Sequence, residues 1–498
     1  MVLVFCLVSS GTLRMGKQAK MNDATRIRAP ELPASLEWFN TEQPLTLASQ
    51  RGKVVLLDFW SYCSINCMHV LPDLRYLEHK YPQNLTVIGI HSPKFENERV
   101  SEQVQKAINR NHIRHPVAND PQFQLWRAYG IKAWPSIIFI DPEGYVVGIL
   151  RGEGRRKQLD ELISKHIDAA EEKGILKHSP MPVKLQPEKA STLSFPGKVL
   201  ATRNNLYIAD SGRNRVLETY HDGKIKRVFG GGTGGMLDGK EDAAMFDNPQ
   251  GMVIVGDFLY VSDTGNHSIR RIHLKSGEVM TLAGNGKQGR YVSDFFREPL
   301  DAELNSPWDL SYYEGNLYIA MAGQHQVWKM NLNHLAIERY AGSGREDIVD
   351  GALEHACFAQ PSGIVTLGSH VFVVDSETSA VRDIEINRGV VSTVVGKGLF
   401  DFGDRGGIGR EARLQHPMGI TVDDERNALW IADTYNSKIK RIDVQTSEVS
   451  AFKFSYQLNE PGGLSLFRDK MFIANTNDHQ IIALDLKSRI AEVVDVRE

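Results

Sequence analysis

The stretch Phe59-Trp60-Ser61-Tyr62-Cys63-Ser64-Ile65-Asn66-Cys67 contains two of the four cysteines in the chain. The residues before it, Lys53-Val54-Val55-Leu56-Leu57-Asp58, form the apolar run that a buried strand needs. The residues after it repeat apolar side chains at helical spacing, at Val70, Leu71, Leu74 and Leu77. The two cysteines are therefore predicted at a strand-to-helix turn. Free backbone N–H groups and the helix dipole favour a thiolate at such a place.

This order of strand, cysteine turn and helix resembles the thioredoxin-like family, whose α/β fold surrounds a central sheet. In that family a Cys-x-x-Cys turn acts on disulfides: the first thiolate attacks and the second cysteine resolves the mixed disulfide. Phe59-Trp60 matches the aromatic pair of the family, Cys67 matches the resolving cysteine, and Pro72 matches the kink proline of the helix. Ser64 stands at the attacking position, and Cys63 precedes it, which gives Cys-x-x-x-Cys.

The ending Ile65-Asn66-Cys67 is typical of a subgroup of this family with a Cys-Ile-Asn-Cys turn. The same subgroup includes proteins that fuse the domain to a propeller of NHL repeats. The resemblance therefore implies a two-domain chain whose chemistry, if any, is centred on Cys63 and Cys67.

Because Ser64 stands where the family has its attacking cysteine, three interpretations of the turn stay open. A Cys63–Cys67 disulfide needs Cβ atoms within about 4.5 Å, whereas helix neighbours four apart are about 5–6 Å apart. The first interpretation is a redox pair in a bent or frayed first turn. In the second, Cys67 alone is a reactive thiol. In the third, the domain is redox-inactive and serves for docking, with Ser64 as a helix cap.

The resemblance implies further site residues. Trp134-Pro135-Ser136 precedes an apolar strand, where the family has a cis-proline that lies against the cysteine turn and shapes the peptide groove. Trp60, Ser64 and Trp134 are the residues expected to line that groove. Asp58 resembles the buried carboxylate that accepts a proton from the resolving cysteine; its alternative is a solvated aspartate at the end of the strand.

Composition limits the other possibilities. The net charge is −3 with 24% charged residues, so no basic domain indicates nucleic acid. Four cysteines in 498 residues form no disulfide framework, and isolated Cys357 is expected as apolar filler. His112 and His115, with arginines beside them, are expected in a solvated loop rather than a metal site. His69 either tunes Cys67 or is a surface helix residue. No cofactor or metal is predicted.

The chain divides into four segments. Residues 1–35 are expected to be a disordered leader, 36–174 the thioredoxin-like domain, 175–190 a proline-containing linker, and 191–498 a β-rich body. No apolar run reaches the length of a membrane span. A cytoplasmic location is expected; export is the alternative, if the apolar first ten residues act as a signal.

The β-rich body repeats a core of an aromatic, two apolar or small residues, and usually Asp, six times. The six cores are Tyr207–Asp210, Tyr260–Asp263, Tyr318–Met321, Phe372–Asp375, Trp430–Asp433 and Phe472–Asn475. A proline precedes each core, at Pro196, Pro249, Pro307, Pro361, Pro417 and Pro461. Repeats of this length with about four short strands each predict a six-bladed β-propeller. The stretch Asp263-Thr264-Gly265-Asn266-His267-Ser268-Ile269-Arg270-Arg271-Ile272 closely resembles an NHL repeat.

The repeated Asp210, Asp263, Asp375 and Asp433 are expected to cap turns within the blades, because Asp side chains bond nearby backbone. Basic residues such as Arg270 and Lys440 recur after these turns and raise the alternative of an RNA-binding face. Near-neutral charge and the absence of interleaved aromatics favour protein partners instead.

The sequence thus predicts a thiol-disulfide redox or redox-sensing protein that uses Cys63 and Cys67, with Pro135 shaping the groove and the propeller selecting a protein partner. Partners would bind at the propeller face or in the thioredoxin groove. The alternative is a non-enzymatic protein-binding scaffold whose thioredoxin-like domain has lost catalysis. An RNA-binding propeller is the third possibility.

Overall fold

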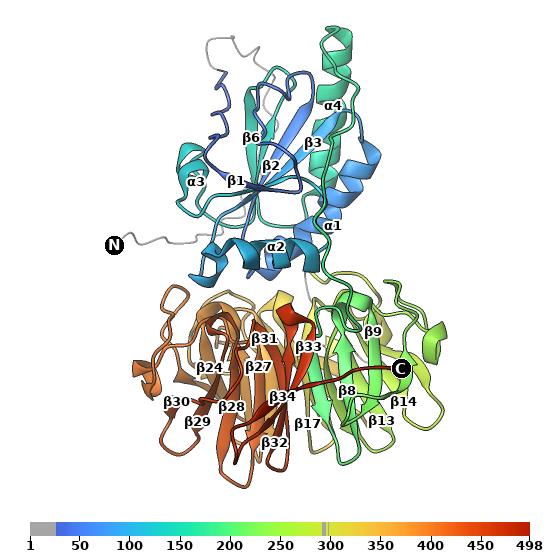
Figure 1. The fold of residues 1–498 in the computed structure, drawn as a ribbon, viewed down its shortest axis with the longest axis vertical. Coiled ribbons are helices and arrows are strands. Elements are labelled where there is room, and N and C mark those ends of the chain that lie inside the picture. Colours follow the sequence, from blue (N-terminus) through green and yellow to red (C-terminus); the bar gives the residue numbers. More distant parts are fainter. Residues whose placement is uncertain (1–25, 291–294, 297) are drawn as a thin grey trace.

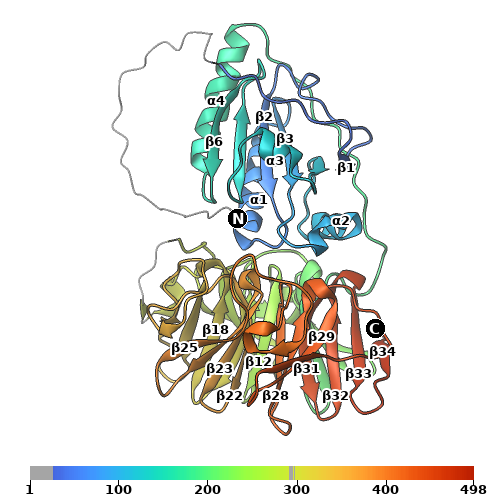
Figure 2. The same cartoon turned by 90° about the vertical axis from the view of Figure 1, so that its left-hand side faces the viewer.

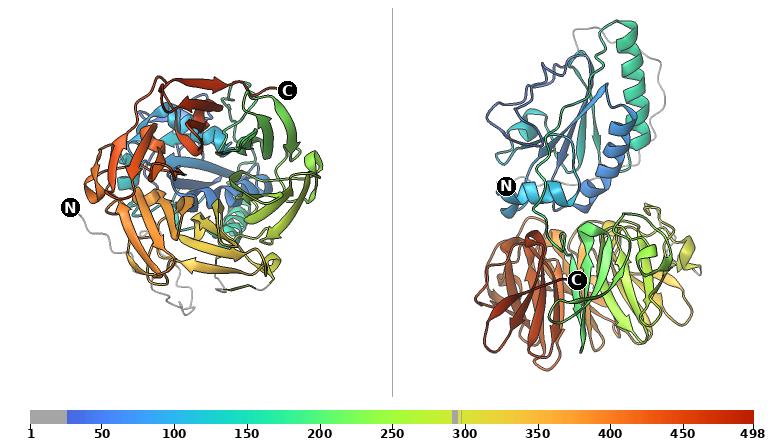
Figure 3. Two further views of the ribbon diagram at one scale, coloured as in Figure 1. Left: turned by 90° about the horizontal axis from the view of Figure 1, so that it is seen from below. Right: turned by 45° about the vertical axis from the view of Figure 1, so that its right-hand side comes forward.

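The computed structural model describes residues 26–290, 295–296 and 298–498. It shows an α/β domain seated on one end of a ring of β-sheets (Figure 1). The segment 175–190 runs without regular structure along the α/β domain to the first blade (Figure 3).

The α/β domain has a six-stranded central sheet in the order β1-β4-β3-β2-β5-β6. β2 pairs in parallel with β3, and β3 with β4, whereas β1, β5 and β6 pair antiparallel. The strands are β1 (Glu37–Phe39), β2 (Val54–Trp60), β3 (Leu85–His91), β4 (Val117–Asn119), β5 (Ser136–Ile140) and β6 (Val146–Arg151). The helices are α1 (Ile65–Lys80), α2 (Ser101–Arg110), α3 (Gln124–Ala128) and α4 (Arg156–Glu172).

Both faces of this sheet are covered, which explains the continuous apolar run of β2. Val54 and Leu56 face helices α1 and α4, and Val55 and Leu57 face the side of α3. Figure 2 shows α1 and α4 on the same side of the sheet. The predicted thioredoxin-like fold is confirmed.

The predicted leader covers residues 1–35, of which positions 1–25 lie outside the described residues. Positions 26–35 lie against the α/β domain. Ala29 and Leu32 are buried in the cluster on the α3 side, and the Ala29 N–H donates to the carbonyl of Gly144 at 3.1 Å. The apolar side chains of this short segment thus belong to the domain core.

The propeller consists of six sheets, and the predicted six blades are confirmed (Figure 3). Blades 1 and 6 are β7 (Lys198–Ala201), β8 (Asn205–Asp210), β9 (Arg215–Tyr220), β10 (Ile225–Phe229), and β31 (Pro461–Phe467), β32 (Lys470–Asn475), β33 (Gln480–Asp485), β34 (Ala491–Val494). Blades 2 and 3 are β12 (Pro249–Val255), β13 (Phe258–Asp263), β14 (Ser268–His273), β15 (Glu278–Ala283), and β17 (Pro307–Tyr313), β18 (Asn316–Met321), β19 (Gln326–Asn331), β20 (Ile337–Ala341). Blades 4 and 5 are β22 (Pro361–Leu367), β23 (His370–Asp375), β24 (Ala380–Glu385), β25 (Val390–Val395), and β27 (Gly419–Asp423), β28 (Ala428–Asp433), β29 (Lys438–Asp443), β30 (Glu448–Ala451).

Four blades carry a two-residue strand on their outer edge. These strands are β11 (Gly239–Lys240), β16 (Phe295–Phe296), β21 (Gly351–Ala352) and β26 (Gly407–Ile408), and each pairs with the last long strand of its blade. They shorten the exposed edge of each sheet, which limits pairing with other chains.

Apolar clusters between neighbouring blades hold the ring together. Leu206 and Ile208 of blade 1 share one buried cluster with Phe472 and Ile481 of blade 6, so the ring is closed. The Thr476 hydroxyl donates to the Pro196 carbonyl at 2.9 Å across this closure. Since one blade cannot bury both faces of its own sheet, all six depend on their neighbours.

The residue before each repeat proline adopts a left-handed backbone, although a residue in that place normally prefers an extended one. The six residues are Phe195, Asn248, Ser306, Gln360, His416 and Glu460. Four of them, Ser306, Gln360, His416 and Glu460, contact the thioredoxin-like domain. The repeated turn therefore forms the end of the propeller on which the other domain is seated.

Candidate functional site at the junction of the two domains

The cysteine turn lies between β2 and α1. Ser64 is the N-cap of α1, and its hydroxyl accepts a hydrogen bond from the Cys67 N–H at 3.4 Å. Cys63 precedes this cap and Cys67 lies in the first helical turn. Both are free thiols, 3% and 0% exposed. At the position of the attacking cysteine the chain thus has a serine that caps the helix.

Burial raises the pKa of both thiols. The carboxylates of Glu377 and Glu98 raise the pKa of Cys63 further, while Lys94 opposes them. Burial also raises the pKa of Cys67 well above its usual value, against the hydrogen bonds that its sulfur accepts from Ser61 and Ser64. The raised pKa values oppose the thiolate expected at the helix start, because burial removes the water that stabilises the charged form.

Glu98 holds the turn in place, and no sequence signal pointed to it. Its Oε1 accepts hydrogen bonds from the Ser61 hydroxyl at 2.6 Å and the Cys63 N–H at 3.0 Å. Its Oε2 accepts from the backbone N–H groups of Lys94 and Phe95 at 2.7 and 2.9 Å. This fully buried carboxylate ties the cysteine turn to the segment that carries Lys94.

Asp58 is buried, which opposes the alternative of a solvated aspartate at the end of the strand. It is 0% exposed, and neither carboxylate oxygen has a hydrogen-bond partner among the described residues. Burial raises its pKa to about 7, although the nearby His115 opposes this shift. The negative charge of Asp58 in turn raises the pKa of Cys67.

The Trp134–Pro135 peptide bond is cis, as the family resemblance implied. The Trp134 ring lies 4.5 Å from the ring of Trp126 and packs at the edge of the cluster that contains Cys63 and Cys67. Trp60, the other aromatic residue expected to line a groove, is only 1% exposed and packs on His91 at 5.1 Å.

The propeller contacts the cysteine turn directly. The Gln360 side chain donates to the Cys63 carbonyl at 2.9 Å and accepts from the Ile65 N–H at 2.8 Å. His416 Nε2 lies 3.2 Å from the same carbonyl. Blades 4 and 5 therefore cover the cysteine turn.

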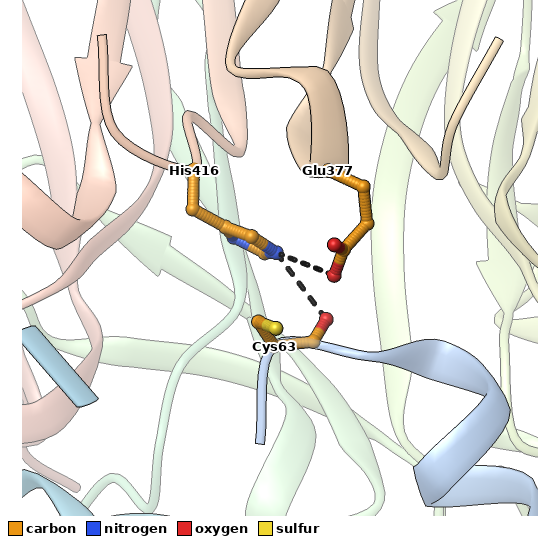
Figure 4. A group of neighbouring side chains, drawn as sticks. All are labelled: Cys63, Glu377 and His416. Atoms are coloured by element: carbon orange, nitrogen blue, oxygen red, sulfur yellow. Dashed lines mark hydrogen bonds and ion pairs between the residues drawn. The ribbon is translucent and has the colours of Figure 1, made fainter. Parts of the chain in front are cut away.

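Three side chains converge at this contact (Figure 4). Cys63 Sγ, a carboxylate oxygen of Glu377 and a ring nitrogen of His416 all lie within 4.8 Å of one another, and all three residues are buried. His416 Nε2 is 3.7 Å from Glu377 Oε1. The sequence showed no metal-ligand spacing here, because Cys63 and His416 are 353 positions apart.

Lys94 fixes the orientation of Glu377. Its ammonium forms a buried ion pair with Glu377 Oε2 and donates to the Glu377 carbonyl at 3.1 Å. Burial alone would raise the pKa of Glu377, but the Lys94 ammonium and His416 hold that pKa well below its usual range. Glu377 is therefore a carboxylate, with Oε1 directed at the cysteine turn.

Blade 6 makes further contacts with the thioredoxin-like domain through Glu460 and Asn477. The Glu460 carboxylate accepts hydrogen bonds from the Tyr62 hydroxyl at 3.1 Å and Asn97 at 2.6 Å, and it pairs with Arg110 at 3.3 Å. The Arg110 guanidinium also donates to Asn477 at 3.1 Å.

The residue two positions after the fourth residue of each repeat core differs between the blades, and it affects how each blade contacts the thioredoxin-like domain. In blades 1 to 6 the residues are Gly212, Gly265, Gly323, Glu377, Tyr435 and Asn477. A Cβ on Gly323 would lie 2.9 Å from the His69 ring, whereas on Gly212 and Gly265 it would meet the propeller's own loop at Ser194 and Asp247. The three larger side chains bind Lys94, Tyr62 and Gln103. This pattern was visible in the sequence and could have indicated one asymmetric end of the ring.

Two histidine predictions need correction. His69 is not a free surface residue, because its ring bonds Glu153 and the Ser306 hydroxyl of the propeller. His115 is 5% exposed, and its carbonyl accepts a hydrogen bond from the Asn40 side chain at 3.1 Å. Only His115 departs from the expected solvated loop, because His112 and Arg114 beside it are exposed.

The prediction that the repeat aspartates cap the turns that follow them is wrong for Asp210, Asp375 and Asp433, whose carboxylates accept no backbone hydrogen bond from those turns. The Oδ1 atoms of all four aspartates accept from backbone N–H groups at least 16 positions earlier in the chain, at Ser194, Asp247, Ala359 and Gln415. The residues concerned are Asp210, Asp263, Asp375 and Asp433, all 0% exposed. They hold the loop that leads into each blade.

Two of the basic residues that follow these aspartates are their buried partners, whereas Lys438 on the same strand as Lys440 is exposed. Arg270 pairs with Asp263, and Lys440 with Asp433, each at 2.8 Å, and both cations are at most 1% exposed. Buried cations bound by carboxylates are unavailable to RNA phosphates. The contacts between these residues thus oppose the RNA-binding alternative.

The fold and the cysteine turn define a class: a thioredoxin-like domain followed by an NHL-type propeller. A thioredoxin-like family model matches residues 52–146. NHL repeat-containing protein 2 of Bos taurus is 38% identical over 519 residues, which cover 94% of this chain and 71% of that protein. The chain therefore belongs to the NHL repeat-containing protein 2 family.

Two other relatives differ in extent. The chloroplastic protein Suppressor of quenching 1 of Arabidopsis thaliana is 38% identical, covering 93% of this chain and 47% of that protein. The thiol-disulfide oxidoreductase ResA of Bacillus cereus is 26% identical over 121 residues, 24% of this chain and 68% of that protein. The second likeness is restricted to a part about the size of the thioredoxin-like domain. Among the described residues, no helix combines the length and apolar character needed to cross a membrane.

Proposed function

We propose that this protein is a thiol-disulfide redox or redox-sensing protein whose reacting pair is Cys63 and Cys67, kept closed by its own propeller. The observation that carries the proposal is the pair of hydrogen bonds between the Gln360 side chain and the cysteine turn. One is to the Cys63 carbonyl and the other is from the Ile65 N–H. A domain that served only as a spacer would not need its cysteine turn at the contact with the propeller.

The proposed reaction is a balanced exchange. One of the two cysteines loses its proton, attacks a disulfide sulfur of the partner, and releases the partner's other sulfur as a thiolate that takes up a proton. The second cysteine then attacks the mixed disulfide. The products are an oxidised Cys63–Cys67 pair and two partner thiols.

Opening of the domain contact is required before this exchange. Both sulfurs are buried and their pKa values are raised, so neither is a nucleophile in the closed arrangement. Separation from blades 4 and 5 would expose Cys63, remove the nearby Glu377 carboxylate, and restore the effect of the helix terminus. The cis-Pro135 segment would then shape the groove for an extended peptide, and Asp58 would serve as proton acceptor for Cys67.

The propeller is the proposed partner-selecting domain. One end of the ring is occupied by the thioredoxin-like domain, so a protein partner would bind the opposite end or the rim, or the groove once the contact opens. The low cysteine content favours a cytoplasmic location as part of this proposal.

The second candidate is a protein-binding scaffold without redox activity. It is favoured by Ser64, which caps α1 where an attacking cysteine would stand, and by the complete burial of Cys67. In that case the two domains form one rigid platform.

Thiol trapping with intact mass, across a glutathione redox series, separates the candidates. Redox function predicts a reversible loss of two hydrogens that disappears in both Cys63→Ser and Cys67→Ser, with Cys357→Ser as the matched control. If both thiols stay free at every potential, even in urea too dilute to unfold the domains but sufficient to part them, the scaffold replaces the redox proposal.

A further inference from the structure

We propose that Cys63, Glu377 and His416 form a metal site of the zinc type that joins the two domains. The ligands would be Cys63 Sγ, Glu377 Oε1 and His416 Nε2, with the fourth position open to water. One ligand comes from the cysteine turn and two from neighbouring blades, so the site exists only when the domains are docked.

The distances suit a tetrahedral ion. Tetrahedral zinc bonds of about 2.0–2.3 Å place ligand atoms about 3.3–3.8 Å apart, with nitrogen and oxygen at about 3.3–3.5 Å. His416 Nε2 and Glu377 Oε1 are 3.7 Å apart, a few tenths of an ångström longer, and no pair among the three ligand atoms exceeds 4.8 Å. A shift of about 1 Å in the Cys63 side chain would complete the set of three bonds at zinc distances.

The ligand atoms are oriented toward one another, and His416 Nε2 would exchange its hydrogen bond to the Cys63 carbonyl for the bond to the metal. Glu377 Oε1 is buried without a hydrogen-bond partner among the described residues, because Lys94 takes the other oxygen. The His416 ring is held by stacking on Tyr435, with centroids 4.4 Å apart, and by an edge contact with Phe95 at 5.2 Å. A buried carboxylate oxygen without a partner is costly unless something satisfies it.

The ligand set selects the metal. Thiolate and imidazole ligands favour zinc and other late transition metals, whereas magnesium and calcium require oxygen ligands. Binding would displace the proton of the Cys63 thiol to solvent. The thiolate and the Glu377 carboxylate would then balance the two charges of the ion, with the Lys94 ammonium and the Glu98 carboxylate beside the site.

The consequence depends on the proposed function. A bound ion would hold Cys63 away from exchange and fix the closed arrangement, so metal release would precede thiol chemistry. The site itself stands on its geometry and does not require that the cysteines react.

The experiment uses the full chain, freed of metal by a chelator under reducing conditions and titrated with Co²⁺ and Zn²⁺. One Co²⁺ per chain is expected, with tetrahedral d–d absorption and a thiolate-to-cobalt charge-transfer band that Zn²⁺ removes. Cys63→Ser should abolish the charge-transfer band. Glu377→Gln and His416→Gln should each weaken binding at least tenfold, and Cys357→Ser is the matched control that keeps the spectrum.

X-ray absorption of the zinc-loaded wild-type chain tests the site without any variant. The expected shell has one sulfur at about 2.3 Å and the other ligands nitrogen or oxygen at about 2.0–2.2 Å. A shell with two sulfurs, a charge-transfer band that survives Cys63→Ser, or no binding by the reduced folded chain would each overturn the proposal. A redox-inactive Cys63–Cys67 pair that still binds zinc would contradict the proposed function alone.

Discussion

Replacement of Asp58 by asparagine should remove a pH-dependent cost of folding. The Asp58 carboxyl is buried under α1 with no partner for either oxygen among the described residues, and its pKa rises from 3.8 to about 7. A pKa difference of about 3 corresponds to about 4 kcal/mol, at 1.36 kcal/mol for each tenfold change in the ionisation constant. This is the additional free energy needed to ionise the carboxyl group in the folded protein, where it is no longer hydrated.

The sign follows from proton linkage. Between about pH 4 and pH 7 the folded state keeps the Asp58 proton and the unfolded state does not, so the stability that the proton supplies is lost as pH rises. Below about pH 4 the contribution is complete, and above about pH 7 it is gone. The amide of an asparagine in this place would stay neutral throughout, and the Asp58→Asn variant should therefore lose less stability between pH 5 and pH 8.

The assay is urea unfolding of wild type and Asp58→Asn at pH 5 and pH 8, compared as a double difference so that other titrating groups cancel. Between pH 5 and pH 8 wild type should lose about 2.7 kcal/mol more than the variant, since about two of the three tenfold steps in the ionisation constant lie above pH 5. Asp257→Asn, at an exposed loop position, should behave as wild type. A protonated-carboxyl infrared band at pH 6 that is absent from Asp58→Asn provides direct support. Equal pH dependence in all three proteins would refute the reasoning and indicate an ionised, hydrated Asp58.

Three further substitutions test the junction. Ser64→Cys restores the two-residue spacing to Cys67, and insulin-reduction activity should rise at least tenfold; unchanged activity would show that closure, not spacing, limits exchange. Gln360→Ala removes two hydrogen bonds of about 1 kcal/mol each, which corresponds to about 30-fold more open form. Alkylation of Cys63 and Cys67 should be faster by that factor in Gln360→Ala. The control Gln326→Ala, which changes a side chain buried within blade 3, should leave the alkylation rate unchanged. Equal alkylation rates in the two variants would contradict the proposed contact. Glu98→Gln turns an acceptor of four hydrogen bonds into a group with its own N–H donors, so the melting temperature should fall by several degrees; an unaltered melting temperature would mean that the turn holds without it.

Local patterns predicted the elements of both domains well. The apolar run 54–59 and the spacing of Val70, Leu71, Leu74 and Leu77 indicated β2 and α1 within two residues. Ser64 was expected as a helix cap and is one. These signals work because strand burial and helix capping depend on neighbours in sequence.

Burial of the site residues was less predictable. The sequence left Asp58 open between a buried and a solvated place, left His69 open between tuning Cys67 and facing solvent, and placed His115 in a solvated loop. Each outcome depends on segments far away in the chain, such as Ser306 for His69. The same holds for the cysteines: the helix start favours a thiolate, but the propeller that covers it removes the water a thiolate needs.

Both folds could be predicted from local patterns, because the cysteine turn and the six repeats each carry their own periodic pattern of apolar residues. How the two domains meet depends on contacts between distant parts of the chain. The pre-proline positions and the residues two after each repeat aspartate differ from blade to blade, and those differences become a surface only when the ring closes. Closing the ring brings Glu377 and His416 together, and docking sets Cys63 against them, since a ring makes neighbours of residues that the chain keeps far apart.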